Sequence, residues 1–441
     1  MATPQVIDNI SELSTILKTV FGPGVEQQQN LTPMLYKRLS QSQVQFGGNS
    51  YEFPARMVNT QSVGARGYRL GLPEPQLNID VTSRVRHKFI YGTFDIAGPD
   101  IEKGKGNVNA FVNTLTDKMR SLTEMVLKDL NHQTFLDGTG VRAQFTANPA
   151  GTGTYDVDTV KYLRQGMHIN VIDSDDGITL LGTGESDPGD TSGTFFQRRW
   201  TILAIDPTGG AAATDGLVTV GIGSPPVATD VTGIDTTPPG DYIARHKAIG
   251  SELTGLGAIV DDGVVNPGAN VLQDINRTVN PLWRAKVLAN AGTPRDLTLT
   301  LMQTAIDVPE IVSGRRVNLI VGSYNARDRY LQLLVPQKRF MDLKLDGGYQ
   351  VLEYNGRDFL VDVDCQDDTI YFLNTQSIQK FGLFDLKFVE QTGGILKHDS
   401  LQAGDVFYGF MRAICNLGTV QANANAKITD LTVDSSYLVN Q

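Results

Sequence analysis

The sequence predicts a mixed α+β protein in which long strands and one long helix accompany a region of short strands. Apolar residues alternate with polar ones between residues 77 and 91, and they recur three and four positions apart between residues 107 and 138. The first period is typical of a half-covered strand and the second of an amphipathic helix. Glycine occupies 45 of 441 positions, against an average near ~7%, which favours many turns.

The first 92 residues predict an arm followed by a long β-hairpin. Residues 1–47 are polar with short apolar patches, and the Gly-Pro-Gly stretch at 22–24 would end a short helix there. Apolar residues then alternate over 51–57 and again over 77–91, with turn residues in between. A two-stranded hairpin is marginal in water by itself, and no following strand in this region is expected to widen it. We therefore expect its apolar face to rest on another chain.

A single helix is predicted over residues 107–138. Asn107 can cap its start, and Gly138 suits its end. Glu124 and Lys128 have the spacing of a favourable ion pair within the helix. At 1.5 Å per residue, the helix is expected to be about 45 Å long. Its apolar stripe consists of Val108, Phe111, Val112, Leu115, Met119, Leu122, Val126 and Leu130.

The rest of the chain predicts a β region followed by an α/β region. Short apolar runs separated by Gly, Asp, Pro and Thr over residues 155–240 indicate a small β-barrel or sandwich inserted into a larger domain. From residue 270, helical and strand patterns alternate. Helices are expected over 271–290, 297–314 and 324–334, and strands over 317–323, 358–364 and 369–374. Residues 405–431 are expected to be β again, with apolar residues alternating over 420–428.

Composition narrows the classes of function. The chain has 38 basic and 48 acidic residues, a net charge of −10, whereas a surface that reads duplex DNA needs positive charge. Cys365 and Cys415 cannot build a disulfide framework and are expected to be buried thiols in a reducing compartment. No apolar run reaches the ~18 residues of a membrane span. The N-terminus lacks the features of a secretory signal, so we expect a cytosol-like compartment.

No catalytic, cofactor-binding or metal-binding constellation stands out in the sequence. None of the five histidines has metal-ligand spacing with another histidine or a cysteine. GTGES at 182–186 lacks the lysine of a phosphate loop, and DSDDG at 173–177 lacks the spacing of a calcium loop. The carboxylate pairs at 261–262 and 367–368 are expected to be solvated turns. The sequence therefore predicts a protein that is not an enzyme and has no cofactor.

Five basic residues are candidates for contacts between subunits. Arg66 and Arg69 fall in the tip of the predicted hairpin, and Arg84, Arg86 and Lys88 fall on its second strand. Two interpretations stay open for them. They form either a solvated edge that discourages strand-to-strand aggregation, or a set of cations that dock on carboxylates of a neighbouring copy.

The order of these parts resembles the major capsid proteins of tailed bacteriophages, the Hong Kong 97 fold family. The resemblance covers nearly the whole chain except about 155–240, and it rests on architecture because no signature peptide defines this fold. The stretches that carry it are LNIDVTSRVRHKFIYGTFDI, the helix at 107–138, GDYIARHKAIGSELTGLGAIVDDG and GFMRAICNLGTVQANANAKI.

The resemblance implies a division of the chain. The expected parts are an N-terminal arm at 1–47, an E-loop hairpin at 48–92, a peripheral domain at 93–154 with its spine helix at 107–138, an inserted β domain at 155–240, peripheral strands at 241–263, an axial domain at 264–382, and a peripheral return with a C-terminal tail at 383–441. The inserted β domain departs from the minimal fold of the family.

The resemblance also implies a function and partners. The subunit would self-assemble as hexamers and pentamers into an icosahedral shell around viral double-stranded DNA, within a virion capsid assembled in the host cytoplasm. The 47-residue arm is short for a cleaved scaffolding segment, so a separate scaffolding protein is expected, together with a portal and a candidate decoration protein. The net charge of −10 implies weak, non-specific contact with DNA, and no membrane is involved. Some relatives are cross-linked through Lys–Asn bonds, but Lys88, the hairpin's one lysine, lies deep in a strand and is not assigned one.

Two alternatives remain at this stage. An encapsulin-type cellular compartment would use the same fold to enclose enzyme cargo. A β-rich carbohydrate-binding or adhesin module would use residues 155–240 for recognition, with Trp200 stacking on sugars. Alternation around Trp200 is typical of an ordinary core residue, which favours the shell-forming interpretation.

Overall fold

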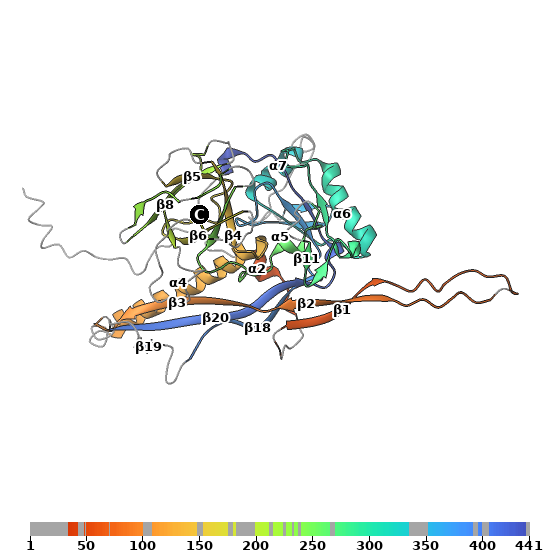
Figure 1. Cartoon of the computed structure of the whole chain (residues 1–441), viewed down its shortest axis with the longest axis horizontal. Coiled ribbons are helices and arrows are strands. Elements are labelled where there is room, and N and C mark those ends of the chain that lie inside the picture. Colours follow the sequence, from red (N-terminus) through yellow and green to blue (C-terminus); the bar gives the residue numbers. More distant parts are fainter. Residues whose placement is uncertain are drawn as a thin grey trace, which may run out of the picture. The chain divides into compact units, whose positions relative to one another are not determined.

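In the computed structural model, the described residues run from 34 to 437, with gaps at 43–47, 49, 70, 100–107, 148–152, 175–179, 182–198, 211–214, 224–225, 232, 237–239, 265–269, 335–351, 391–395 and 399–404. The predicted N-terminal arm lies outside them except for α2 (Leu35–Arg38) and its flanks. The stretch 182–186 and most of 173–177 also lie outside them. Figure 1 shows the arrangement of the described elements.

The predicted hairpin is confirmed. β1 (Ser50–Val58) and β2 (Ile79–Arg86) pair antiparallel, with Ser50 opposite Arg86. Side-chain burial alternates along both strands, as the period of two requires. Ala55 and Met57 point into a core that also contains Leu35 and Phe135. The base of the hairpin is therefore covered by its own chain.

The prediction of one continuous strand over 77–91 is wrong, because the strand is interrupted at His87. β3 (Lys88–Ala97) leaves the hairpin and pairs antiparallel along its whole length with β20 (Val406–Thr419). The hairpin itself stays two-stranded, as expected, but the segment beyond His87 gains a partner strand from its own chain. The partner strand follows some three hundred residues later, and local periodicity carries no information about which distant strand completes a sheet.

The long helix is confirmed as α4 (Val108–Phe135), and it packs on the sheet that β3 and β20 form with β18 (Ile378–Phe388) and β19 (Lys397–His398). Val126 and Leu130 contact a cluster that includes Ile90 and Met411. Gly92 is required at this crossing, because an added Cβ would lie 2.6 Å from Cγ2 of Val126. The absence of a side chain at one position of β3 therefore sets how closely helix and sheet approach.

A closed sheet follows the helix. Its core holds Trp200, Val171 and Val220 among other fully buried side chains, so Trp200 is a core residue. The strands are β4 (Val141–Ala147), β5 (Thr154–Val157), β6 (His168–Ile172), β7 (Trp200–Asp206), β8 (Gly216–Ile222) and β10 (Tyr242–Arg245), paired in the order β5-β4-β10-β6-β7-β8 and closed by pairing of β8 with β5, while β9 (Val227–Ala228) extends from β8. The boundaries of the inserted domain stay a prediction.

A mixed six-stranded sheet forms the next layer. Helices α6 (Leu299–Ser313) and α7 (Tyr324–Leu334) cover one face, where Ile320 packs with Met302. The other face packs Val321 against a cluster that includes α5 (Leu256–Ile259) and Phe135 of α4. The strands, in spatial order, are β13 (Lys286–Leu288), β21 (Ala426–Ile428), β17 (Ile370–Leu373), β14 (Leu319–Gly322), β16 (Arg357–Val361) and β15 (Leu352–Tyr354).

Two local predictions in this part are wrong. Residues 271–290 are not a helix but contain β11 (Val271–Leu272), β12 (Ile275–Asn276), the 3-10 turn η2 (Pro281–Trp283) and β13. Gln273 and Asp274 between β11 and β12 both have positive φ, the geometry of a two-residue hairpin turn. The β structure predicted over 405–431 is present as β20 and β21, but the alternating stretch 420–428 is interrupted by a 3-10 turn, η4 (Ala422–Ala424), before β21. A last turn, η5, spans Ser435–Tyr437.

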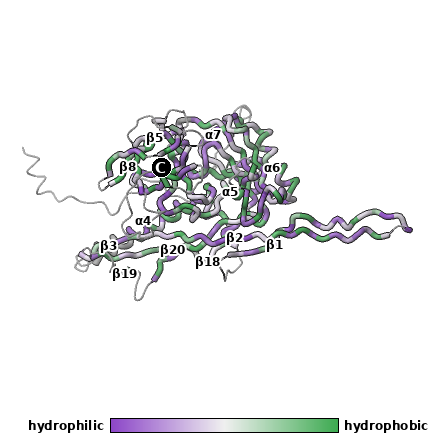
Figure 2. Tube along the Cα trace, viewed as in Figure 1, coloured by the Kyte–Doolittle hydropathy of each residue, from purple (hydrophilic) through white to green (hydrophobic). Residues whose placement is uncertain are grey.

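Both cysteines are buried thiols that form no disulfide with each other, as the composition predicts. Across the described residues, no helix combines the length and the apolar character that crossing a membrane requires. Figure 2 shows hydrophobic residues concentrated in the layered elements and also occurring along the two arms of the hairpin.

Candidate assembly surface and buried charge cluster

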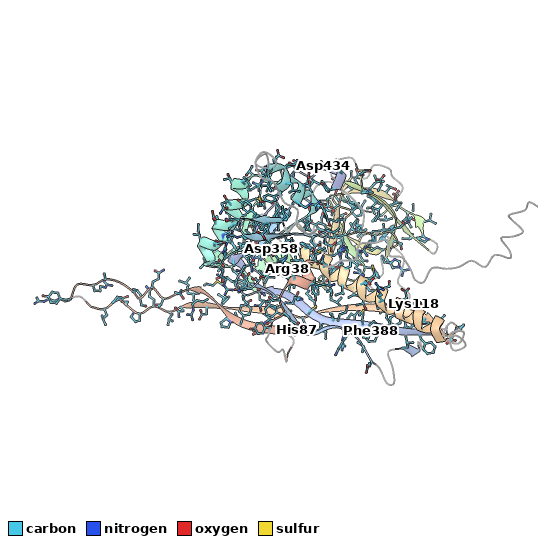
Figure 3. The ribbon with its side chains drawn as sticks, turned by 180° about the vertical axis from the view of Figure 1, so that it is seen from behind. Arg38, His87, Lys118, Asp358, Phe388 and Asp434 are labelled. Carbon is cyan, nitrogen blue, oxygen red and sulfur yellow. The ribbon has the colours of Figure 1, made fainter. Side chains whose placement is uncertain are left out.

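The hairpin beyond β1 and β2 exposes large apolar side chains. Val63 is 88% exposed, Tyr68 93%, Leu72 90% and Leu77 92%. We call these four residues the tip patch. Figure 3 shows the side chains of this part of the hairpin standing out on both sides of the two arms. Single exposed apolar residues are ordinary on protein surfaces, whereas a group of them on one projecting segment marks an interaction surface.

Contacts between the arms hold this part of the hairpin in shape. The amide of Thr60 donates to Oδ1 of Asn78 at 2.7 Å, and Oγ1 of Thr60 donates to the carbonyl of Gln76 at 2.8 Å. The amide of Gln76 in turn donates to Oγ of Ser62. Side chains thus replace the regular ladder of the strands, and the tip patch is presented on an extended support.

The five candidate basic residues divide into two groups. Arg66 lines a hollow at the tip together with Glu74, and the guanidinium of Arg69 lies 5.3 Å from the ring centre of Tyr68. Neither arginine has an ion pair within the described parts of the chain. Both are therefore available for a carboxylate of another molecule.

The other three candidates are engaged with their own chain. Arg84 contacts Glu52 at 2.6 Å and Asp274 at 3.5 Å, and Arg86 contacts Asp274 at 2.9 Å. The amide of Arg84 also donates to the carbonyl of Gln273 at 2.9 Å. The β11–β12 turn therefore braces the base of the hairpin. Nζ of Lys88 donates to the carbonyl of Gly250, and burial lowers the pKa of Lys88.

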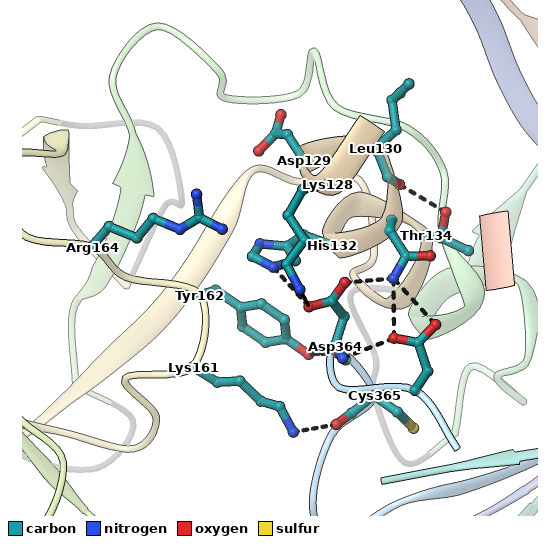
Figure 4. Close-up of polar contacts among 12 residues, drawn as sticks. Lys128, Asp129, Leu130, His132, Thr134, Lys161, Tyr162, Arg164, Asp364 and Cys365 are labelled. Atoms are coloured by element: carbon teal, nitrogen blue, oxygen red, sulfur yellow. Dashed lines mark hydrogen bonds and ion pairs between the residues drawn. The ribbon is translucent and has the colours of Figure 1, made fainter. Parts of the chain in front are cut away.

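A buried charge cluster lies where segments distant in sequence meet (Figure 4). Nζ of Lys128 on α4 lies 2.8 Å from Oδ1 of Asp364, and both side chains are fully buried. Nε2 of His132, one turn along the helix, lies 2.8 Å from the same oxygen. Asn131 donates to Asp362 at 3.0 Å, and the amide of Asp364 donates to Asp362 at 2.9 Å. The loop after β16 is thereby fixed to the C-terminal part of the long helix.

Two further segments join this cluster. The amide of Leu35 in α2 donates to Asp362 at 2.9 Å, and the amide of Tyr36 donates to Asn131 at 3.0 Å. The hydroxyl of Tyr162, in the loop between β5 and β6, donates to the carbonyl of Asp364 at 2.8 Å. The cluster therefore holds together the chain entering the hairpin, the long helix, the closed sheet and the mixed sheet.

The charge states follow from these contacts. Burial raises the pKa of Asp364, but the hydrogen bond and charge of His132 and the charge of Lys128 outweigh it and hold the pKa at about 2. Burial lowers the pKa of His132, against the opposing effect of Asp364. Burial and the charge of Asp364 raise the pKa of Asp362. Asp364 is thus the ionised partner of Lys128 at neutral pH.

Sequence reasoning missed this cluster. The predicted pair of Glu124 with Lys128 is wrong, because Glu124 pairs with Arg120 at 2.9 Å while Lys128 reaches Asp364. A local rule finds partners one helical turn apart, whereas burial against a distant loop decided the pairing here. The one sequence signal for the cluster was the position of Lys128, one helical turn before His132, on a helix whose apolar stripe had to be covered.

The paired carboxylates also differ from their prediction. Asp261 is buried and lies 2.7 Å from Nζ of Lys427, and Asp367 lies 2.8 Å from Nζ of Lys161. Asp261 ties its loop to β21, and Asp367 ties its loop to the loop between β5 and β6, so these two positions are not solvated corners. Within the described residues, no group of three or more histidine, cysteine, aspartate or glutamate side chains is placed to hold a metal ion.

The fold matches those of solved shell proteins. The chain is similar to one in the capsid of cyanophage A-1(L), with 12% identity, a TM-score of 0.56, and coverage of 95% of this chain and 98% of that one. It is also similar to the capsid chain of a native GTA particle, with 9% identity, a TM-score of 0.48, and coverage of 97% and 100%. A chain of the SrpI encapsulin from Synechococcus elongatus PCC 7942 has 9% identity, a TM-score of 0.44, and coverage of 97% and 96%.

No protein-family model matches the sequence, and no curated protein matches it either. The match to the cyanophage capsid chain nevertheless spans nearly the whole of both chains. The predicted α+β fold of phage capsid proteins is therefore confirmed. The chain thus has a phage capsid fold.

Proposed function

We propose that this protein is the structural subunit of a bacteriophage capsid, and that copies of it assemble through the tip patch into an icosahedral shell around double-stranded DNA. The observation that carries the proposal is the exposure of Val63, Tyr68, Leu72 and Leu77 on a segment supported by cross-arm hydrogen bonds. The phage capsid fold supports it, because that fold is used for shells in the cyanophage structure.

Energetics favour contact between copies. Covering one large apolar side chain is worth about 1.5–3 kcal/mol, so the tip patch offers several kilocalories per mole to a partner surface. At the base of the hairpin, Ala55, Met57 and Val85 are already buried in their own chain, so these side chains gain nothing further. Arg66 and Arg69 would add charge complementarity, which sets orientation and association rate more than affinity. In the proposed shell, the part of the hairpin beyond β1 and β2 contacts the neighbouring copy.

The proposed partners follow from the same picture. Other copies of the chain are the main partner, arranged as hexamers and pentamers. A separate scaffolding protein, a portal and a decoration protein complete the proposal, with assembly in the host cytoplasm. A net charge of −10 supports weak, non-specific contact with packaged DNA.

The test compares the full-length chain with a Tyr68→Ser/Leu72→Ser variant by sedimentation velocity and negative-stain electron microscopy. We expect capsomers, tubes or shells from the unmodified chain, and a concentration requirement raised by at least about tenfold in the variant. Val227→Ser is the matched control, because Val227 is 66% exposed on β9 and lies outside the hairpin. Assembly of the control should match the unmodified chain.

The contents of purified native particles separate the phage capsid from an encapsulin-type compartment. Nuclease-protected double-stranded DNA is expected inside them, whereas a loaded enzyme would indicate the compartment. A chain that stays monomeric under all conditions, or a tip variant that assembles as well as the unmodified chain, would contradict the proposal.

A further inference from the structure

A second feature lies beside the buried charge cluster, in the cleft between α4 and the closed sheet. The cleft has a volume of about 450 Å³ and is lined by Arg142, Arg164, Arg245, Asp129 and His132, among others. The three arginines come from the closed sheet and its loops, whereas Asp129 and His132 come from the long helix. The long helix and the closed sheet therefore both supply charged groups to the cleft.

The charges in the cleft do not balance. Nη1 of Arg245 lies 2.7 Å from Oδ1 of Asp129, and Arg142 contacts the same oxygen at 3.4 Å and also Glu252. These two carboxylates are matched by two arginines. Arg164 is the third cation. Burial lowers the pKa of His132 and favours its neutral form, so the imidazole adds no positive charge to the cleft. One guanidinium charge is left over.

Arg164 has no carboxylate partner in the described part of the chain. Its one hydrogen-bonding contact there is from Nη1 to Sδ of Met125 at 3.6 Å, and sulfur is a weak acceptor. The side chain is half-buried, and Figure 4 shows it extending toward His132 and Asp129 without a marked contact to either. An arginine keeps its charge in proteins, and a partly desolvated charge without a partner is costly.

We propose that this cleft is a binding site for a small oxyanion of the phosphate or carboxylate class, held by Arg164. The planar guanidinium presents paired donors that match such oxygens. The bound anion neutralises the unmatched charge and links the loop between β5 and β6 to the long helix. This inference does not depend on the shell-forming role.

The test is calorimetric titration of the full-length chain with inorganic phosphate, and separately with acetate, at constant ionic strength. Saturable binding of one anion per chain is expected. Arg164→Met should weaken it by about tenfold or more, the usual worth of a charge-assisted hydrogen bond, and Arg164→Lys should weaken it less. Arg120→Met is the control, because Arg120 is a well-exposed arginine on α4, outside the cleft lining and paired with Glu124, and it should bind as the unmodified chain does.

The two titrants identify the source of the anion. Preference for phosphate assigns a free or esterified phosphate, and preference for acetate assigns a carboxylate such as a side chain of another molecule. The proposal is overturned if neither anion saturates, or if binding by the folded Arg164→Met chain equals that of the unmodified chain. If Arg164→Met does not fold, the titration of the unmodified chain and the weaker binding expected of Arg164→Lys test the proposal instead. Equal binding by the Arg164→Lys chain and the unmodified chain would then overturn it.

Discussion

Lys128 and Asp364 are separated by more than two hundred residues in sequence, yet Nζ and Oδ1 lie 2.8 Å apart with both side chains fully buried. Neither charge is solvated, so each depends on the other and on the donors around Asp364. A buried pair of this kind adds little net stability compared with apolar residues, but losing one partner is costly. The pair therefore acts as a point where the long helix and the loop after β16 must meet correctly.

Asp364→Asn is expected to lower the free energy of unfolding by about 3–5 kcal/mol, because it leaves the ammonium of Lys128 buried without its counter-charge. Denaturant unfolding followed by circular dichroism measures this. Asp358→Asn is the matched control, since Asp358 pairs with Arg38 while 41% of its side chain is exposed. That pair should be worth about 0–1 kcal/mol. Equal losses in the two variants would contradict the role of the buried pair.

His132 should make stability depend on pH between about 7 and 5. In the unfolded chain a histidine takes up a proton as pH falls through about 6.5, whereas burial lowers the pKa of His132 in the folded chain. The unfolded state then binds more protons, so stability falls as pH falls, by up to about 1.4 kcal/mol per pH unit. His132→Gln should flatten this part of the profile.

The comparison of the two profiles isolates His132. Burial raises the pKa values of Glu252 and Asp362, so their contribution runs in the opposite direction and is lost as pH rises through the folded values. Both groups are present in either chain, and subtracting one profile from the other removes them. Parallel profiles for the two chains would rule out the buried neutral histidine.

Gly92→Val is expected to destabilise the protein by about 1–3 kcal/mol through overpacking, because the new Cβ would lie 2.6 Å from Val126 and 3.1 Å from Leu122. Thermal unfolding measures the change. Gly71→Val serves as the control, since nothing lies within 4 Å of a Cβ at that position, and it should change stability by less than about 0.5 kcal/mol. A neutral Gly92→Val would mean that α4 does not press on β3 here.

Removing the charges of Arg66 and Arg69 should slow assembly several-fold at low salt, with the difference shrinking toward 1 M salt, where charges are screened beyond about 3 Å. Both arginines lack an ion pair in the described part of the chain, so their charge is available to a neighbouring copy. Light scattering of the Arg66→Ser/Arg69→Ser variant measures the rate. An assembly rate that does not depend on salt concentration would mean that the two arginines do not contribute and that the apolar tip patch makes the whole contact.

The sequence predicted the elements whose pattern is long and regular. The stripe from Met119 to Leu130 indicated the long helix, and the strict alternation of Tyr51, Phe53, Ala55 and Met57 indicated a hairpin strand. It also predicted β14 and α7, where a short apolar run and a helical period stand next to each other. In these elements the local period alone decides which side of the backbone is covered.

Among the candidate contact residues, the sequence placed Arg66 and Arg69 in the tip correctly but could not separate them from Arg84 and Arg86. All lie in one hairpin, and the difference comes from carboxylates at its base: Glu52 on the opposite strand and Asp274 of the β11–β12 turn. That turn was predicted as part of a helix, because its positive φ angles leave no mark in a hydrophobic pattern.

The sequence by itself determined that this chain has one long helix and an alternating hairpin, because these properties depend on neighbours a few positions away. Only the tertiary structure decided that β3 joins β20, that Lys128 meets Asp364 and that Arg164 has no carboxylate partner among the described residues. Pairings between distant segments are set by which surfaces can be buried together, and no periodic pattern along the chain encodes that choice.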